Sequence, residues 1–298
     1  MKLDVRELAE QANNLMGKDV ILEGWIRNHR KQKEFGFIEF YDGTSFKNLQ
    51  IVYDNKLANF DAITKYMVGS SIRVYGKLVE SQGKQEFEIS ASNIELLGDC
   101  DESYPIQPKR HTREFLREVG YLRPRTNLFR AVFRIRSLAA MAIHEYFQDR
   151  GYVYLHAPLI TGSDCEGAGE MFQVTTLDLE NLKKENGSVD YKQDFFKKRA
   201  SLTVSGQLQG EAFAMAFKKI YTFGPTFRAE NSNTKTHAAE FWMIEPEIAF
   251  CDLDGLMDIE EDVLKYIIRY VLEKGKNEME FFNEFVEPGL IDKLKMVL

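Results

Sequence analysis

Residues 221–250, YTFGPTFRAENSNTKTHAAEFWMIEPEIAF, carry charged and aromatic side chains that could bind a charged ligand. Two largely apolar runs flank the polar stretch NSNTKTH, which predicts two β-strands joined by a loop. Because side chains alternate between the faces of a strand, Arg228 and Glu230 should lie on the same side of the first strand.

The return strand should carry an acidic and aromatic row. The positions of Phe241, Glu245 and Glu247 differ by four and two, so these side chains should share one face. A buried charge is costly unless it is paired or bound to a ligand. The flanking runs are too apolar for an exposed hairpin, which favours a binding surface. The alternative is a solvated sheet face with surface ion pairs.

The bulk composition is that of an ordinary globular protein. The chain has 298 residues, enough for two domains, and a formal net charge of −7, which argues against indiscriminate coating of nucleic acid. No apolar run could span a bilayer, and MKLDVRELAE lacks the apolar centre of a signal peptide. Cys100, Cys165 and Cys251 have no CxxC spacing, which predicts neither a disulfide framework nor a zinc site. We expect a cytoplasmic protein with no membrane partner.

The N-terminal third is predicted to be mostly β-structure. Residues 1–16 have the spacing of a short amphipathic helix. Five strands should follow, namely DVILEGWI, FGFIEFYDG, LQIVYD, SIRVYGKLVE and QEFEISASNIELL, with the helical piece LANFDAITKYM between the third and fourth. This layout predicts an OB-fold β-barrel. The alternative is a generic five-stranded barrel without a ligand.

A basic turn is predicted after the first of these strands. The stretch RNHRKQK contains Arg27, Arg30, Lys31 and Lys33. Phe37 and Gln50 lie on the strands that follow. Cations beside an aromatic ring suit single-stranded nucleic acid, because the cations meet phosphates and a base stacks on the ring.

Helices dominate the rest of the chain. Residues 98–127 contain Pro105, Pro108 and Pro124 and predict a basic linker with a short helix, able to lie against a polyanion or simply solvated. A long amphipathic helix is expected from about 127 to 150, followed by the strand YVYLHAPLI. LTVSGQLQGEAFAMAF predicts a strand, a polar turn and a helix. Residues 253–274 predict another helix, and a last helical piece ends the chain.

Two further segments are predicted to be irregular. TGSDCEGAGEMFQV, after the strand that contains Pro158, is rich in glycine and should form a loop able to move. Residues 177–200, LDLENLKKENGSVDYKQDFFKKRA, are mostly polar and charged, which predicts a surface insertion.

In these motifs the chain resembles the class II aminoacyl-tRNA synthetases, in the subclass for Asp, Asn and Lys. That family's first motif is a long helix, a glycine and a strand ending in proline, matched here by Gly151, YVYLHAPLI and Pro158. Its second motif is F-R-x-E, a loop and an acidic-aromatic pair, matched by FRAE, NSNTKTH and EF. SGQLQ precedes the second motif.

The resemblance implies an α+β fold and a homodimer formed through the first motif. An OB-fold anticodon-binding domain is expected at residues 1–100 and a basic hinge at 101–127. A class II antiparallel β-sheet core flanked by helices is expected at 128–298. The family's third motif, a Gly-rich segment ending in Arg, has no match in the chain. We therefore expect a catalytic core that is incomplete at its C-terminal end and inactive by itself.

Within the subclass, YTFGPTFRAENSNTKTHAAEFWMIEPE resembles the asparagine-specific members, whereas aspartate-specific members carry Asp in place of Glu245. The implied reaction is the ATP-dependent activation of L-asparagine to asparaginyl-adenylate and its transfer to tRNA(Asn), with Mg²⁺ neutralising the triphosphate. Three alternatives remain open. They are an aspartyl enzyme that charges one or both tRNAs, a non-catalytic tRNA-binding module, and an asparagine synthetase, which the anticodon domain disfavours.

The resemblance also implies roles at the ATP site. Arg228 would hold the α-phosphate and the substrate carboxylate, since its planar fork binds two anionic groups together. Glu230 would receive the adenine amino group, and Phe241 would stack on the adenine ring. His237 would approach the outer phosphates, although a loop histidine is often only solvated.

The remaining implied roles concern the amino acid and the anticodon. Glu166, Ser205 and Gln207 would hold the α-amino group of the substrate, and Glu245 would select its side chain. The residues expected to contact the central uridine of the anticodon are Arg30, Phe37 and Gln50. No metal ligand is assigned in the chain.

Overall fold

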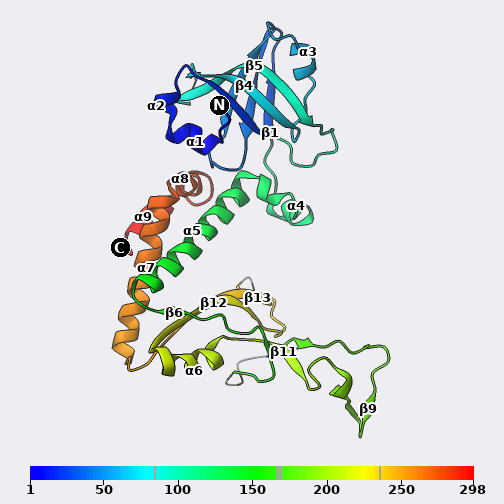
Figure 1. The fold of residues 1–298 in the computed structure, drawn as a ribbon, viewed down its shortest axis with the longest axis vertical. Coiled ribbons are helices and arrows are strands. Elements are labelled where there is room, and N and C mark those ends of the chain that lie inside the picture. The colour runs from blue at the N-terminus through cyan, green and yellow to red at the C-terminus, as the bar shows by residue number, and fades with distance from the viewer. Residues whose placement is uncertain (84, 166, 168–169, 235) are drawn as a thin grey trace. The chain divides into compact units, whose positions relative to one another are not determined.

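The computed structural model describes residues 1–298 except 84, 166, 168–169 and 235 (Figure 1). The chain divides into two compact units. The first contains Met1–Leu138 and Val271–Leu298, and the second contains Ala139–Tyr270. Two long helices, α5 (Asn127–Asp149) and α7 (Leu253–Lys274), pass through the boundaries between these ranges, and both match their predicted bounds closely.

The first unit contains a closed five-stranded barrel in the order β1-β2-β3-β5-β4 (Figure 1). Its strands are β1 (Asp19–Lys31), β2 (Phe35–Tyr41), β3 (Leu49–Asp54), β4 (Ser71–Glu80) and β5 (Phe87–Gly98), with α3 (Phe60–Ile63) between β3 and β4. Alternate residues of β1 to β4 are buried and fill the barrel, as expected for a small barrel. The predicted OB-fold layout is confirmed.

The predicted basic turn is wrong in one respect, because β1 is longer than expected. The pairing of β1 with β2 continues to Lys31, which lies opposite Gly36. Arg27, Arg30 and Lys31 are therefore strand residues, and the tight connection begins only at Gln32. The charges of this region are thus held in the fixed geometry of a β-ladder.

The predicted N-terminal helix is two short helices, α1 (Val5–Glu10) and α2 (Ala12–Leu15). The helix breaks at Gln11, which has φ −112° and ψ 12°. Asp4 begins α1 with a capping box, since its side chain accepts from the backbone of Glu7 while the Glu7 side chain accepts from the backbone of Asp4. Buried side chains of both helices join the barrel core, namely Val5, Leu8 and Leu15.

The linker of the first unit folds as predicted, with a short helix. It contains α4 (Arg113–Glu118) and a 3₁₀ turn at Arg123–Arg125. Three apolar side chains form its own small core, namely Ile106, Leu116 and Leu122. The C-terminal helices α8 (Lys276–Phe285) and α9 (Leu290–Lys295) also belong to this unit.

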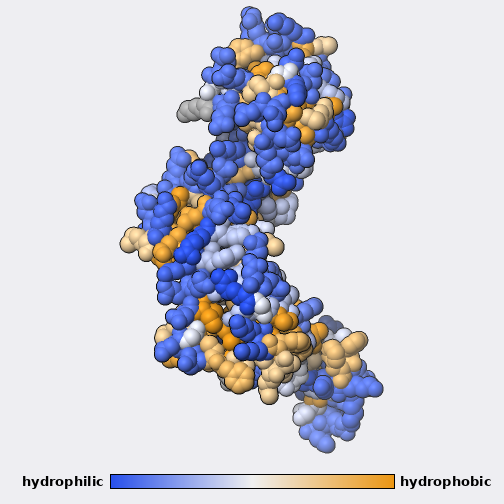
Figure 2. All heavy atoms as spheres, turned by 60° about the vertical axis from the view of Figure 1, so that its left-hand side comes forward, coloured by the Kyte–Doolittle hydropathy of each residue, from blue (hydrophilic) through white to orange (hydrophobic). Residues whose placement is uncertain are grey.

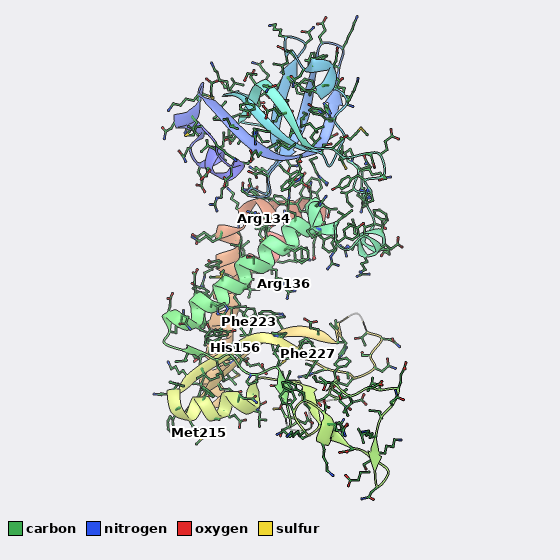
Figure 3. The ribbon with its side chains drawn as sticks, turned by 45° about the vertical axis from the view of Figure 1, so that its right-hand side comes forward. Arg134, Arg136, His156, Met215, Phe223 and Phe227 are labelled. Atoms are coloured by element: carbon green, nitrogen blue, oxygen red, sulfur yellow. The ribbon has the colours of Figure 1, made fainter. Side chains whose placement is uncertain are left out.

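The second unit is built on the mixed sheet β13-β12-β6. The antiparallel hairpin consists of β12 (Lys219–Phe227) and β13 (Glu240–Ile248), and β6 (Val153–Tyr154) runs parallel to β12. Side chains of α5 and α7 pack around Tyr221 on the odd-numbered face of β12. On the even-numbered face Ile220 packs against Ala214 of α6 (Gln207–Phe217), whose Met215 points outward and is exposed (Figure 3).

Smaller strands complete this unit. The sheet β7-β11-β8 joins Ile160–Thr161, Ala200–Leu202 and Gln173–Val174. The predicted insertion contains the hairpin of β9 (Lys184–Glu185) and β10 (Ser188–Val189), followed by a 3₁₀ turn at Tyr191–Gln193. Within the described residues, no helix is both long enough and apolar enough to cross a membrane.

The strand expected over YVYLHAPLI is wrong as a single element. It is divided into β6 and β7, and the last backbone bond to β12 comes from Leu155, whose N–H donates to the carbonyl of Tyr221 at 2.9 Å. Pro158 lies between the two short strands. A proline has no N–H to donate to a ladder, which accounts for the interruption.

Candidate functional site

The hairpin of β12 and β13 brings the predicted acidic and aromatic side chains onto one face. Thr222 is paired with Glu245, and Thr226 is paired with Phe241. Paired residues of antiparallel strands project to the same side. Phe241, Glu245 and Glu247 therefore share one face, as predicted, and it is the face on which the even-numbered side chains of β12 lie. The face therefore carries an aromatic ring at the loop end and carboxylates further along.

The prediction that strand alternation places Arg228 and Glu230 on the same side is wrong. β12 ends at Phe227, so strand alternation does not set the directions of either side chain. Arg228 still pairs with the return strand through its backbone N–H, which donates to the carbonyl of Ala239 at 3.0 Å. Glu230 lies beyond this point and is exposed.

The Arg228 side chain lies against Phe241. Its Cζ is 5.5 Å from the centre of the phenyl ring, a cation–π distance. The Nε atom of Arg228 is buried and has no hydrogen-bond partner among the described residues. A buried guanidinium nitrogen without a partner is unfavourable in the free protein. The site is therefore suited to an anionic group beside a flat ring.

The loop after β12 holds the other two residues assigned to ATP. Glu230 and His237 are both exposed, and no described hydrogen bond or ion pair joins either of them to Arg228. His237 is hydrogen-bonded through Nδ1 to the hydroxyl of Thr234 in the same loop. The structure thus brings together Arg228 and Phe241 but not the full set of four.

The side chain of Glu245, on β13, lies beside the N-terminus of α6. Its Oε2 accepts from the backbone N–H of Gly206 at 3.0 Å and from the hydroxyl of Thr222 at 3.0 Å, and its Oε1 accepts from the hydroxyl of Ser205. The N-terminus of a helix favours a negative charge. A Cβ at Gly206 would lie 2.7 Å from Thr222 Oγ1, so glycine is needed for this close approach.

The other predicted amino-acid-binding residues adjoin this carboxylate in part. Ser205 is buried and bonded to Glu245. Gln207, the first residue of α6, donates from its side chain to Glu211 at 3.0 Å and accepts from the thiol of Cys165 at 3.8 Å. Glu166 lies outside the described residues. Ser205, Gln207 and Glu245 are thus near one another, although the prediction treated Glu245 separately.

A cavity of about 220 Å³ opens beside Glu245. It is lined by polar groups of Thr203, Gly206, Thr222 and Glu245, and by His156, Phe223, Pro225 and Trp242 among others. Figure 3 shows His156 close to Phe223. Sequence reasoning missed His156, because it was counted only as part of a continuous strand. The proline two residues later was the available signal that the chain leaves the sheet here.

The three residues predicted for the anticodon meet on the barrel. Arg30 on β1 is paired with Phe37 on β2, and its Cζ lies 5.1 Å from the ring centre. Nη2 of Arg30 donates to the side-chain oxygen of Gln50 at 3.1 Å. The cation, the ring and the amide are therefore one cluster on the barrel surface, beside a polar pocket of about 300 Å³.

Sequence reasoning missed Glu88, which orients this cluster. Glu88 is 8% exposed, and its Oε2 accepts from the Gln50 amide at 2.8 Å and from the Ser81 hydroxyl at 2.8 Å. This bond directs the Gln50 oxygen toward Arg30. The signal was weak, since a glutamate in QEFEIS is expected to be solvated at an open strand.

Among the residues that the structure describes, no three His, Cys, Asp or Glu side chains gather as metal ligands would. Among the described residues, Cys100, Cys165 and Cys251 form no disulfide. No residue is therefore assigned to Mg²⁺.

Two family models match the chain. Residues 112–296 match the model described as tRNA synthetases class II (D, K and N), and residues 20–97 match the model described as an OB-fold nucleic acid binding domain. Among curated relatives, the asparagine–tRNA ligase of Clostridium novyi is 58% identical over 99% of this chain. That of Acholeplasma laidlawii is 58% identical over 100% of it. The chain spans 64% and 65% of the lengths of these two relatives.

A solved structure agrees with these matches. The asparaginyl-tRNA synthetase of Pyrococcus horikoshii, complexed with asparaginyl-adenylate, matches with a TM-score of 0.82 and 26% sequence identity. The match covers 100% of this chain and 63% of the Pyrococcus chain. The asparaginyl-tRNA synthetase of Entamoeba histolytica, at 20% identity and a TM-score of 0.78, shares the fold.

Proposed function

Since the chain belongs to the class II tRNA synthetases of the D, K and N family, we propose that it acts in an asparagine–tRNA ligase. The complete reaction would activate L-asparagine with ATP and transfer it to tRNA(Asn). Because the chain spans less than two thirds of its curated relatives, the proposal concerns the whole protein to which these residues contribute.

One observation carries the proposal for ATP. The guanidinium of Arg228 lies against the Phe241 ring with a buried, unpartnered Nε atom. A nucleotide offers the two complementary parts, a base that stacks on a ring and a phosphate that accepts from guanidinium. We assign Glu230 to the adenine amino group and His237 to the outer phosphates, from the loop that follows β12.

The activation step needs positioning and positive charge. A carboxylate oxygen of asparagine attacks the α-phosphorus of ATP, the bond to the bridging oxygen breaks, and pyrophosphate leaves. Arg228 would hold the carboxylate and the α-phosphate in line for this attack. Mg²⁺, when bound, neutralises charge on the triphosphate. In the second step a terminal hydroxyl of tRNA attacks the asparaginyl carbonyl, and AMP leaves.

The substrate side chain would be selected by Glu245. A carboxylate accepts hydrogen bonds from the amide NH₂ of asparagine and repels the charge of aspartate. Gly206, Ser205 and Thr222 hold this carboxylate at the edge of the cavity. We assign Ser205, Gln207 and Glu166 to the α-amino group.

The barrel would bind the anticodon of tRNA. Phe37 is the stacking platform for the central uridine, Arg30 supplies positive charge, and Gln50 hydrogen-bonds to the base. These three side chains form one cluster before any ligand is bound, which lowers the cost of ordering them on binding.

A homodimer would form through the segment that contains β6 and β7. Exposed apolar side chains there support this part of the proposal, namely Val153, Tyr154, Leu159 and Ile160. We place the protein in the cytoplasm, where the tRNA and amino acid of this reaction are available.

The decisive test is ATP–pyrophosphate exchange with the full-length product of the gene, comparing asparagine with aspartate at equal concentrations. Faster exchange with asparagine is expected. Faster exchange with aspartate would instead identify an aspartyl enzyme. Tight tRNA binding without exchange for either amino acid would identify a non-catalytic tRNA-binding protein.

A further inference from the structure

An aromatic pair projects from the insertion of the second unit. The side chains of Phe195 and Phe196 are 74% and 42% exposed, with ring centres 4.8 Å apart and ring planes at 78°. Single exposed apolar residues are ordinary on protein surfaces, but two adjacent phenyl rings are a larger apolar area in water. None of the roles assigned above involves these residues.

A buried carboxylate holds the pair in place. Asp194 is 5% exposed and accepts from the Thr175 hydroxyl at 2.7 Å and from the backbone and hydroxyl of Thr176, each at 2.9 Å. It also accepts from the backbone N–H of Phe195 at 2.8 Å. These bonds lower the pKa of Asp194 to about 2, with the Thr176 backbone bond as the largest cause. The rings are therefore presented from an anchored turn.

The chain turns sharply after the rings. Lys197 has φ +56°, a conformation that non-glycine residues seldom adopt, and its N–H donates to the carbonyl of Asp194 at 3.0 Å. Lys197, Lys198 and Arg199, which follow the two rings in the sequence, are all exposed at this turn. The arrangement is preorganised, so little ordering remains to be done when a ligand binds.

Positive charge surrounds the aromatic pair. Lys197, Lys198 and Arg199 are all exposed, and none of them forms an ion pair within the described residues. A fourth cation, Lys192, is paired with Glu185 at 2.6 Å. On a chain with a net charge of −7, three adjacent unpaired cations are a local exception. Figure 2 colours one face of the molecule by hydropathy and shows apolar side chains, in orange, bordered by hydrophilic ones, in blue.

We propose that residues 195–199 bind a single-stranded stretch of RNA, with bases stacked on Phe195 and Phe196 and phosphates held by the three cations. Aromatic rings beside unpaired Lys and Arg match the chemistry of single strands. The cores of protein–protein interfaces, by contrast, are depleted of lysine. The identity of the RNA as the single-stranded 3′ end of tRNA rests on the proposed function.

The test uses the full-length protein and two RNA probes. One is a hairpin made of the acceptor stem of tRNA(Asn) with its single-stranded 3′ end, and the other lacks the single-stranded nucleotides. Neither contains an anticodon, so the barrel cluster does not contribute. Dissociation constants are measured by fluorescence anisotropy for the wild type, Phe195→Ala, Phe196→Ala and Phe195→Tyr. Leu179→Ala is the matched control, since Leu179 is a 70% exposed apolar residue of the same insertion.

The loss of one stacked base predicts a dissociation constant at least about fivefold higher for Phe195→Ala with the complete hairpin. The shortened hairpin should show no such change, and Phe195→Tyr and Leu179→Ala should bind like the wild type. Lys198→Gln should lower the slope of log Kd against log salt by about 0.7 for a single strand.

Equal affinity of Phe195→Ala and wild type for the complete hairpin would overturn the inference. A change in oligomeric state in the alanine variants, with RNA affinity unchanged, would show that the rings contact protein instead. Exchange of pyrophosphate with asparagine tests the proposed function separately. If that exchange fails while hairpin binding depends on Phe195, the function falls and the RNA surface stands.

Discussion

Arg130 donates a hydrogen bond from Nη2 to the side-chain oxygen of Asn48 at 2.9 Å, across 82 positions of the chain. The same nitrogen donates to the carbonyl of Phe46 at 2.7 Å. Arg130 is 8% exposed, and burial lowers its pKa to about 10, so it remains charged at neutral pH. The first turn of α5 is thereby joined to the loop between β2 and β3.

This contact reaches the polar pocket of the barrel through Asn48. Because the Asn48 oxygen accepts from Arg130, its amide nitrogen is free to donate to Glu39 at 2.5 Å. Glu39 lines the pocket together with Arg30 and Gln50. Arg130 therefore orients a side chain of this pocket from outside it, through Asn48 and Glu39.

Arg130→Ala should destabilise the first unit. The change leaves the Asn48 oxygen and the Phe46 carbonyl without their donor, which predicts a loss of about 2–3 kcal/mol in the free energy of unfolding. Urea denaturation followed by circular dichroism measures it. Arg136→Ala, an exposed position of the same helix (Figure 3), is the control and should change stability by less than about 0.5 kcal/mol. Equal effects of the two changes would contradict the structural role of Arg130.

Phe37→Ala should weaken tRNA binding by about 1–3 kcal/mol through the loss of one stacked base. Filter binding with tRNA(Asn) measures the effect, and pyrophosphate exchange without tRNA should be unchanged. Trp25→Ala removes another exposed aromatic of the barrel and serves as the control. If Phe37→Ala slows exchange as well, the assignment of the ring to the anticodon is wrong.

Arg228→Ala should abolish adenylate formation and leave tRNA affinity nearly intact, because the guanidinium is assigned only to ATP and the substrate carboxylate. Arg228→Lys should also be strongly impaired, since an ammonium cannot bind two anionic groups in one plane. Pyrophosphate exchange and tRNA binding are measured on the same full-length variants. Loss of tRNA affinity together with exchange would refute this division of labour.

Glu245→Gln should reduce both stability and selectivity. The NH₂ that replaces one carboxylate oxygen cannot accept the bond from Ser205, or else those from Gly206 and Thr222, so about 1–3 kcal/mol of folding free energy should be lost. The preference for asparagine over aspartate in pyrophosphate exchange should fall by about tenfold or more, because the repelling charge is removed.

Ser205→Ala separates the two effects of Glu245. It removes one donor to the carboxylate but keeps the charge, so it should lower stability while the preference for asparagine is largely retained. An unchanged preference in Glu245→Gln would remove Glu245 from the selection of the amino acid.

The insertion should respond to acid through Asp194. Its folded-state pKa of about 2 lies below the ordinary value of 3.8, so its stabilising bonds are fully present above pH 3.8 and are lost as the pH falls toward 2. The stability difference between the wild type and Asp194→Asn should therefore shrink over this range. Hydrogen exchange of the Thr176 and Phe195 amides measures it, and a difference independent of pH would contradict the assignment.

Local patterns were sufficient for most secondary-structure elements and for the face that Phe241 and Glu245 share, whereas the roles of the site residues were implied by the resemblance to a family. Periodicity placed α7 at 253–274, alternation placed the barrel strands, and even spacing placed Phe241 and Glu245 on one face. These features depend on neighbours within a few residues. They can therefore be read along the chain without knowing what lies beside it in space.

Only the tertiary structure decided the features that depend on pairing and closure. The pairing of β1 with β2 turned the expected basic turn into strand and stacked Arg30 on Phe37. Burial left the Nε atom of Arg228 without a partner, and packing joined Arg130 to Asn48. The register of strands and the packing of helices decide which side chains meet in such contacts and how exposed they are. No pattern within a few residues of the chain encodes either.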